Sequence, residues 1–128
     1  MIVWGGQNNA LGLLNDGARF NVAGNNEWSQ MNGNPPSARR RHTAVFFKAL
    51  SRMVVWGGFG PGNAPLGDGG VFDTSGGGQW LEPSIPGGPD PSVDHTAVAA
   101  GSRMIIWGGS GSGGVTNKGA VLDMTKVP

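Results

Sequence analysis

Cysteine and tyrosine are both absent from the 128 residues, and charged side chains make up 13% of the chain. Without cysteine there is no disulfide framework and no thiolate metal site, although this leaves the cellular compartment open. The 9 Lys and Arg residues nearly balance the 8 Asp and Glu residues. The sequence therefore has no excess of basic residues with which to bind a polyanion, and nucleic acid is not an expected partner.

Long apolar runs are missing too, since no segment reaches the roughly 18 apolar residues that read as a membrane span. Residues 1–6 already have the composition of a strand, with no basic region and apolar stretch of a signal peptide before them. Either the start of a precursor is absent from this sequence or the protein was never exported. The sequence leaves both alternatives open.

Glycine is the abundant residue, with 25 copies beside 9 prolines. Without periodicity, such a content would suggest a low-complexity, disordered chain. Here the glycines separate short apolar runs such as VVW, IIW and TAVFF. Short strands joined by turns have this pattern, so we expect a folded, all-β protein.

An apolar segment ending in Trp-Gly-Gly occurs three times, and its tryptophans, 52 and 51 residues apart, are Trp4, Trp56 and Trp107. A fixed period near fifty residues marks a repeat architecture. Three further features recur in the same order: a strand ending in Asn or Asp, a tryptophan, and an HTAV segment. They are found at Asn21, Asp73 and Asp123, at Trp28 and Trp80, and at His42 and His95. We name the four strands A (HTAV), B (apolar, ending in Trp-Gly-Gly), C (ending in Asn or Asp) and D (with Trp).

The residue types of these strands fit a four-stranded antiparallel blade. Strand B is apolar without alternation, which is expected of a strand covered on both faces. Its glycine pair allows a turn at positive φ or the close approach of another backbone. The Asn or Asp that ends strand C can start the next turn through its side chain.

These residues resemble the kelch repeat, which has His in its first strand, a Gly pair ending the second, an aromatic-Asp pair in the third and Trp in the fourth. The positions that carry the resemblance are Trp4, Gly5, Gly6, Trp28, His42, Trp56, Gly57, Gly58, Trp80, His95, Trp107, Gly108 and Gly109. Three features depart from the pattern: Leu122 replaces the aromatic residue, Ser92 stands where the other copy has Arg39, and tyrosine is absent. The HTAV and RM(V/I)(V/I)WGG segments are most similar to those of multi-copy kelch chains of bacterial, often exported, proteins. This resemblance implies an extracellular or periplasmic location.

The resemblance implies blades of a β-propeller, which normally has about four to eight of them. The chain holds about two and a half repeats: residues 1–36 form a blade without its first strand, 37–90 a complete blade, and 91–128 a blade without its fourth strand. Such an arc cannot close into a ring alone and needs neighbours for its end blades. It is a piece of a larger propeller, a unit that assembles head-to-tail with copies of itself, or part of a blade set on another subunit.

The titratable residues favour structural roles. His42 and His95 occupy equivalent positions of different blades without clustered ligands, so we expect each to bond to backbone across a blade junction, and we expect no metal or cofactor. Turn formation is the expected role of the aspartates, rather than acid–base catalysis or calcium binding; they are Asp16, Asp68, Asp73 and Asp123. Arg39 occupies the repeat's own Arg position, while Arg40 and Arg41 are expected to be solvated.

In an antiparallel blade, the B–C and D–A connections emerge at one face. We expect the B–C connections to be long loops over residues 7–16, 59–68 and 110–117, whereas the A–B turn at 99–102 is short. Because loops on a rigid scaffold carry function, a ligand is expected at the B–C/D–A face. The candidate binding residues are Asn8, Asn9, Phe59 and Asn63.

The sequence thus predicts a non-catalytic scaffold that binds protein or glycan or serves as a structural component. The alternative is a fragment of a propeller enzyme whose active site lies elsewhere. One similar to galactose oxidase would use a copper site with Tyr and Cys, and this chain has neither. A sialidase-like hydrolase would have repeated Ser-x-Asp-x-Gly-x-x-Trp turns, which are not found.

Overall fold

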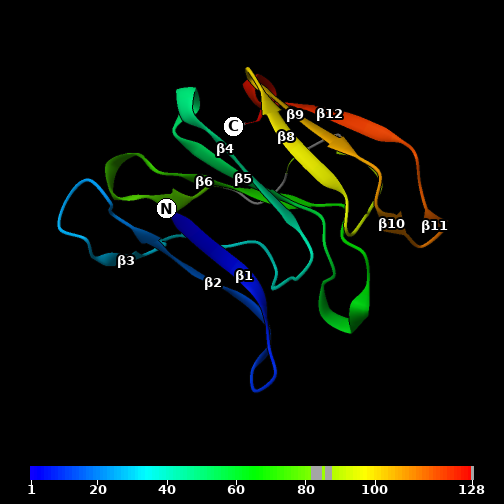
Figure 1. Cartoon of the computed structure of the whole chain (residues 1–128), viewed down its shortest axis with the longest axis horizontal. Coiled ribbons are helices and arrows are strands. Elements are labelled where there is room, and N and C mark those ends of the chain that lie inside the picture. The colour runs from blue at the N-terminus through cyan, green and yellow to red at the C-terminus, as the bar shows by residue number, and fades with distance from the viewer. Residues whose placement is uncertain (82–84, 86–87, 128) are drawn as a thin grey trace.

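The computed structural model describes residues 1–81, 85 and 88–127, and these form antiparallel sheets (Figure 1). The strands are β1 (Ile2–Asn8), β2 (Gly12–Phe20), β3 (Trp28–Gln30), β4 (Thr43–Phe47), β5 (Arg52–Trp56), β6 (Gly69–Asp73), β7 (Gln79–Trp80), β8 (Thr96–Ala100), β9 (Arg103–Trp107), β10 (Ser110–Gly111), β11 (Gly114–Val115) and β12 (Gly119–Asp123). Four single 3-10 turns are η1 (Lys48–Leu50), η2 (Pro61–Asn63), η3 (Ser75–Gly77) and η4 (Met124–Lys126). The described residues contain no α-helix, and among them no helix is long and apolar enough to cross a membrane.

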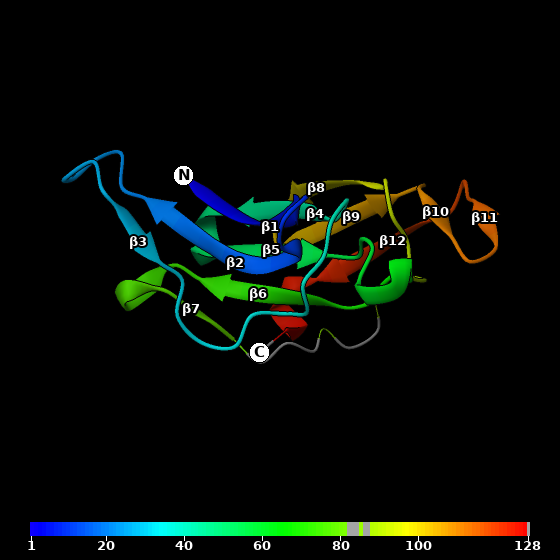
Figure 2. The same cartoon turned by 90° about the horizontal axis from the view of Figure 1, so that it is seen from below.

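Three main sheets follow one another along the chain, in the strand orders β1-β2-β3, β4-β5-β6-β7 and β8-β9-β12. The first corresponds to strands B, C and D, the second to A through D, and the third to A, B and C. Figure 2 shows β1, β4 and β8 along one side of the molecule, with β6 and β7 toward the other. The strand orders of these antiparallel sheets confirm the expected all-β fold of successive kelch-type blades. The three sheets do not close into a ring.

Strand β5 is the centre of the middle sheet and is buried on both faces. In register, Val54 lies opposite Val45 of β4 and Val71 of β6. Met53 and Val55 belong to an apolar cluster with Trp4 of the first sheet. On the other face, a second cluster joins the middle sheet to the third; it contains Val45, Phe47, Val54, Trp56, Val71, Ile85, Met104, Ile106, Leu122 and Met124. In β5 the lack of alternation therefore has the predicted cause, whereas β9, the B strand of the third blade, is buried on one face only.

The glycine pairs have the predicted backbone conformation in all three copies. Gly57 and Gly58 have φ of +64° and +93°, and the corresponding residues Gly5, Gly6, Gly108 and Gly109 also have positive φ. The N–H of Gly58 donates to the carbonyl of Ser92 (2.8 Å). A Cβ on Gly58 would lie 2.6 Å from the carbonyl oxygen of Arg40, so both the turn and the close approach of another segment require glycine.

Two of the expected B–C loops contain strands instead, which corrects the sequence prediction. β1 continues to Asn8 and β2 begins at Gly12, so most of 7–16 is a two-stranded ribbon with a register shift between Trp4 and Gly6. In the third blade, β10 and β11 form a small hairpin within 110–117. These pairs are held by backbone hydrogen bonds and have no buried apolar face, so they leave no alternating pattern in the sequence.

Candidate functional site: the loop face of the blades

The B–C and D–A connections meet at the Trp-Gly-Gly ends of the strands, and we call this end the loop face. The β1–β2 tip, the η2 loop and the β10–β11 hairpin project there (Figure 1). The segment that enters a blade is bonded to the B–C connection of the same blade: the N–H of Arg40 donates to the carbonyl of Phe59 (3.0 Å), and the N–H of Phe59 donates to the carbonyl of Arg40 (2.8 Å). Val93 and Ser110 form a similar pair of bonds. The loops are therefore fixed by backbone hydrogen bonds.

Phe59 is the centre of a side-chain cluster on this face. The guanidinium carbons of Arg40 and Arg41 each lie 5.4 Å from the centre of its ring. Arg40 also donates to the side-chain oxygen of Asn63 (2.9 Å), and Nε of Arg41 donates to Oδ1 of Asp94 (2.6 Å). We call these five residues the Phe59 cluster. It combines an aromatic ring, two cations held against it and polar groups at its rim.

Repeat geometry brings the ion pair of this cluster together. Arg41 and Asp94 each precede the histidine of an HTAV strand, and each has a left-handed backbone, with φ of +57° and +54°. Because they occupy the same position of successive blades, their side chains meet across the junction. Arg40 and Arg41, which the sequence analysis expects to be solvated, also contact the ring of Phe59, and the Arg41 side chain is 50% exposed.

The four predicted binding residues fall into two places. Phe59 and Asn63 lie together in the Phe59 cluster. Asn8 and Asn9 lie at the end of the β1–β2 ribbon, where Oδ1 of Asn8 accepts from the N–H of Ala10 (3.0 Å). The side chain of Asn8 thus caps its own turn, so the structure gives it a local role.

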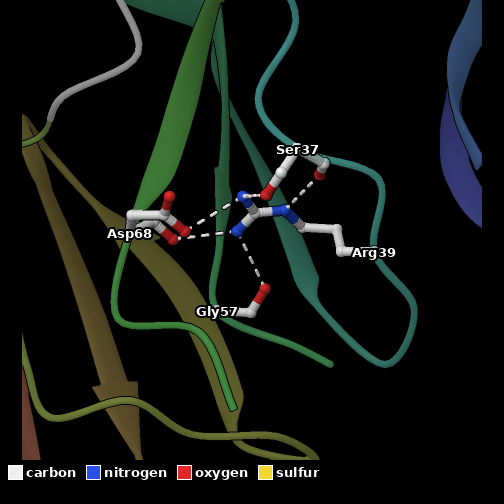
Figure 3. Close-up of polar contacts among 4 residues, drawn as sticks. All are labelled: Ser37, Arg39, Gly57 and Asp68. Carbon is white, nitrogen blue, oxygen red and sulfur yellow. Dashed lines mark hydrogen bonds and ion pairs between the residues drawn. The ribbon is translucent and has the colours of Figure 1, made fainter. Parts of the chain in front are cut away.

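Arg39 lies directly beside the Phe59 cluster and is fully buried (0% exposed). Its hydrogen bonds join the loops on the inner side of this cluster. Its guanidinium donates to the carbonyls of Gly57 (3.1 Å) and Asp68 (3.0 Å), and it forms an ion pair with the Asp68 carboxylate at 3.0 Å (Figure 3). It also donates to the carbonyl and hydroxyl oxygens of Ser37, both at 3.0 Å. Burial lowers the pKa of Arg39, and the charge of Asp68 opposes this shift. Arg39 is structural, as its repeat position suggested.

The role of Asp68 was missed by the sequence prediction, which treated it as a turn residue. A signal was present: the third copy has Ser92 in place of Arg39 and Lys118 in place of Asp68. The two positions change together within one chain, as expected of partners. Asp73 and Asp123 do have the predicted turn role, because their carboxylates accept from the N–H groups of Ser75 and Thr125.

The two histidines lie at the blade junctions. The ring of His42 packs edge-on against Trp4 with centres 5.3 Å apart. Nε2 of His95 is 2.8 Å from the Thr43 hydroxyl, and its Nδ1 is 3.2 Å from the hydroxyl of Ser92. The part of the chain that the structure describes contains no group of three His, Asp or Glu side chains that could hold a metal ion. This arrangement fits junction packing.

Acid should weaken the first junction through His42. Burial first, and then the nearby charge of Arg39, lower its pKa from 6.5 to about 4, with the Trp4 backbone opposing the shift; burial likewise lowers the pKa of His95. A histidine whose folded pKa is depressed contributes its full stability above pH 6.5 and loses it as pH falls toward 4. Because solvent partly screens the His42 ring, we expect the free energy of unfolding to fall by about 1–2 kcal/mol between pH 6.5 and 4.

Urea unfolding at pH 7.5, 6, 5 and 4.5 would measure this loss, with His42→Asn as the control that cannot titrate. The variant should show a flatter dependence over the same interval. An unchanged slope in His42→Asn would assign the acid sensitivity to other groups. Asp73 and Asp123, whose pKa values are lowered by hydrogen bonds from Ser75 and Thr125, lose their contribution only as pH falls below about 3.8.

A hollow with a volume of about 750 Å³ opens on the loop face beside the third blade. It is lined mainly by residues 88–92 and 111–120, and Asp90 and Lys118 are its charged residues. No aromatic side chain is among its lining residues, in contrast to the Phe59 cluster. The Phe59 cluster is therefore the better candidate for recognition.

A family model described as the KLHDC2/KLHL20/DRC7 Kelch-repeats domain matches residues 1–127. The match includes all three sheets and the whole loop face.

Proposed function

We propose that this chain, which belongs to the kelch-repeat family, is a non-catalytic propeller segment that binds a protein partner through its loop face. Kelch propellers are scaffolds that usually mediate protein interactions. The observation that supports this site is the Phe59 cluster, because aromatic and arginine side chains are enriched where protein interfaces have their largest energetic contributions. The backbone hydrogen bonds between the loops also pre-organise the surface, which lowers the entropic cost of binding.

A non-catalytic role is favoured by how the described titratable residues are engaged. Both histidines pack at blade junctions, and Asp68, Asp73 and Asp123 bind neighbouring groups of their own blade. Panels of oxidisable alcohols and of glycan substrates would test this point. Turnover by the purified chain would overturn it in favour of a propeller enzyme.

The end of the arc supports completion by further blades, either from additional chain or from another subunit. Trp56 is fully buried at the second junction, whereas its repeat counterpart Trp107 is 58% exposed. Val98, Ile105 and Val121 are exposed on the same outer face of the third sheet. A contiguous apolar surface of this kind is typical of an interface. The resemblance to exported bacterial kelch chains favours an extracellular or periplasmic location for the assembled protein.

Substitution of Phe59 by Ala should weaken partner binding by about tenfold or more, since an aromatic anchor at an interface contributes about 2 kcal/mol. Candidate partners would be captured with the purified chain and identified, and their dissociation constants measured by calorimetry with purified proteins. Arg40→Ala should weaken the same binding. Phe46→Ala is the matched control, because Phe46 is an exposed phenylalanine of β4 outside the loop face.

Equal affinities for the wild type, Phe59→Ala and Arg40→Ala would contradict the assignment of the loop face. A glycan array offers the second arm of the test. Binding of a glycan that is lost in Phe59→Ala would replace the protein partner by a carbohydrate.

A further inference from the structure

The hollow beside the third blade lies where the middle blade holds its buried arginine. In the middle blade, the guanidinium of Arg39 donates to the carbonyls of Gly57 and Asp68 and to both oxygens of Ser37 (Figure 3). The hollow, of about 750 Å³, is lined by the residues at the same four repeat positions, which are Asp90, Ser92, Gly108 and Lys118 in place of Ser37, Arg39, Gly57 and Asp68. The site that surrounds Arg39 is thus repeated without the arginine.

The backbone around the two positions is the same. The N–H of Gly57 donates to the carbonyl of Asp68 (3.0 Å), and the N–H of Gly108 donates to the carbonyl of Lys118 (2.9 Å). In both blades the entering segment is bonded to the B–C connection. Within the described chain, the groups that bond to the Arg39 guanidinium all belong to these two segments of its own blade. The third blade therefore keeps the frame of acceptors and lacks the donor.

No described side chain of the third blade takes the place of the arginine. The hydroxyl of Ser92 lies 3.2 Å from Nδ1 of His95, so it is engaged at the blade junction. Asp90 and Lys118 are exposed, and their charged groups have no hydrogen-bond or ion-pair partner among the residues that the structure describes. An acidic group and two backbone carbonyls are thus available in the hollow.

One alanine helps to keep this space open. In the middle blade the entering segment packs directly on β6, because a Cβ on Gly70 would lie 2.8 Å from Cγ of Pro36. The third blade has Ala120 and Pro89 at these positions, and both line the hollow. Since the added methyl group would be too close, the segment with Pro89 must lie farther from β12.

We propose that this hollow binds the guanidinium group of an arginine side chain of the protein partner. The carbonyls of Gly108 and Lys118 accept from it, as their counterparts accept from Arg39. The Asp90 carboxylate replaces the Ser37 hydroxyl by a charged acceptor, which forms stronger hydrogen bonds to a cation. A planar group with several donors fits these acceptors better than an ammonium does. The inference rests on the proposed function only in assigning the arginine to the partner of the loop face.

Three pentapeptides with blocked ends test the chemistry of the ligand. They have arginine, lysine or citrulline between two pairs of glycines, and their binding to the isotope-labelled chain would be followed by amide chemical shifts. The arginine peptide should bind at least about tenfold more tightly than the other two, because lysine lacks the planar fork and citrulline lacks the charge. The largest shifts should occur at the amides of Ser92, Gly108 and Lys118.

Variants of the chain test the site itself. Ser92→Arg supplies the missing side chain and should abolish binding of the arginine peptide, whereas Ser29→Arg, the same change on the exposed strand β3, should leave it unchanged. Asp90→Asn should weaken binding about tenfold. Lys118→Asp, which restores the acidic residue of the middle blade, should tighten it about threefold. The last two variants change exposed residues, so they test the site even if Ser92→Arg does not fold.

Equal affinity of the arginine and lysine peptides, absence of saturable binding, or unchanged binding in Asp90→Asn would overturn the proposal. Tighter binding of free arginine than of the peptide would contradict its assignment to a protein partner. If the arginine peptide does not bind while the loop-face partner does, this inference fails and the proposed function stands. If the peptide binds but Phe59→Ala leaves the affinity for the partner intact, the proposed function fails instead.

Discussion

Replacement of Arg39 by Ala should lower the free energy of unfolding by about 3–5 kcal/mol, because it removes a buried side chain that donates hydrogen bonds to several backbone carbonyls. The guanidinium is fully buried and bonds to the carbonyls of Ser37, Gly57 and Asp68. Removing it leaves these acceptors without their donor and opens a cavity between the B–C connection and the preceding segment. For a domain with about 5–15 kcal/mol of stability, such a loss is a large part of the total.

Urea unfolding at pH 7.5 would measure the effect, and three variants would resolve its origin. Arg39→Lys keeps the positive charge but loses the planar guanidinium group with its several donors, so it should still lower the free energy of unfolding by about 2 kcal/mol. Asp68→Asn should cost less than Arg39→Ala, because the Asp68 side chain is 58% exposed and its carbonyl remains. Arg40→Ala, on the surface beside it, should change stability by about 0.5 kcal/mol or less. A similarly small effect of Arg39→Ala would show that the buried network does not hold the loops.

Replacement of Trp56 by Ala should cost about 3–5 kcal/mol, whereas the same change at Trp107 should cost about 1 kcal/mol or less. The two residues end equivalent B strands, but Trp56 is fully buried between two sheets and Trp107 is 58% exposed. The difference between them measures the energy that a neighbouring blade adds at one repeat position. Thermal or urea unfolding of the two variants side by side would give it.

Trp56→Phe serves as the control for the cavity. Nε1 of Trp56 is buried without a hydrogen-bond partner among the described residues, so phenylalanine keeps most of the apolar contact and removes an unsatisfied donor. We expect a loss smaller than that of Trp56→Ala. Equal costs at positions 56 and 107 would mean that the outer face of the third sheet is already covered in solution, which would point to self-assembly.

The candidate site could be predicted only in part. Phe59 and Asn63 were found because they lie in a loop at the expected face, but the same criterion also selected Asn8, which caps its own turn. The contact of Phe59 with Arg40 and Arg41 joins a B–C connection to the segment that precedes the same blade. Nothing in the local pattern encodes this contact, because it depends on how the chain returns to the blade.

By itself, the sequence determined the repeat, its strand order and its turns. The unbroken apolar run of strand B, the positive-φ glycine pair and the turn-forming Asp73 are local features, and each acts through its own backbone or its immediate neighbours. The tertiary structure decided how equivalent residues differ. Trp4, Trp56 and Trp107 share one motif, yet their exposure is 7%, 0% and 58%. Each tryptophan is buried only where a neighbouring blade, about fifty residues away along the chain, covers it. The thrice-repeated motif alone therefore could not reveal which copy lies in the core and which lies on an open face.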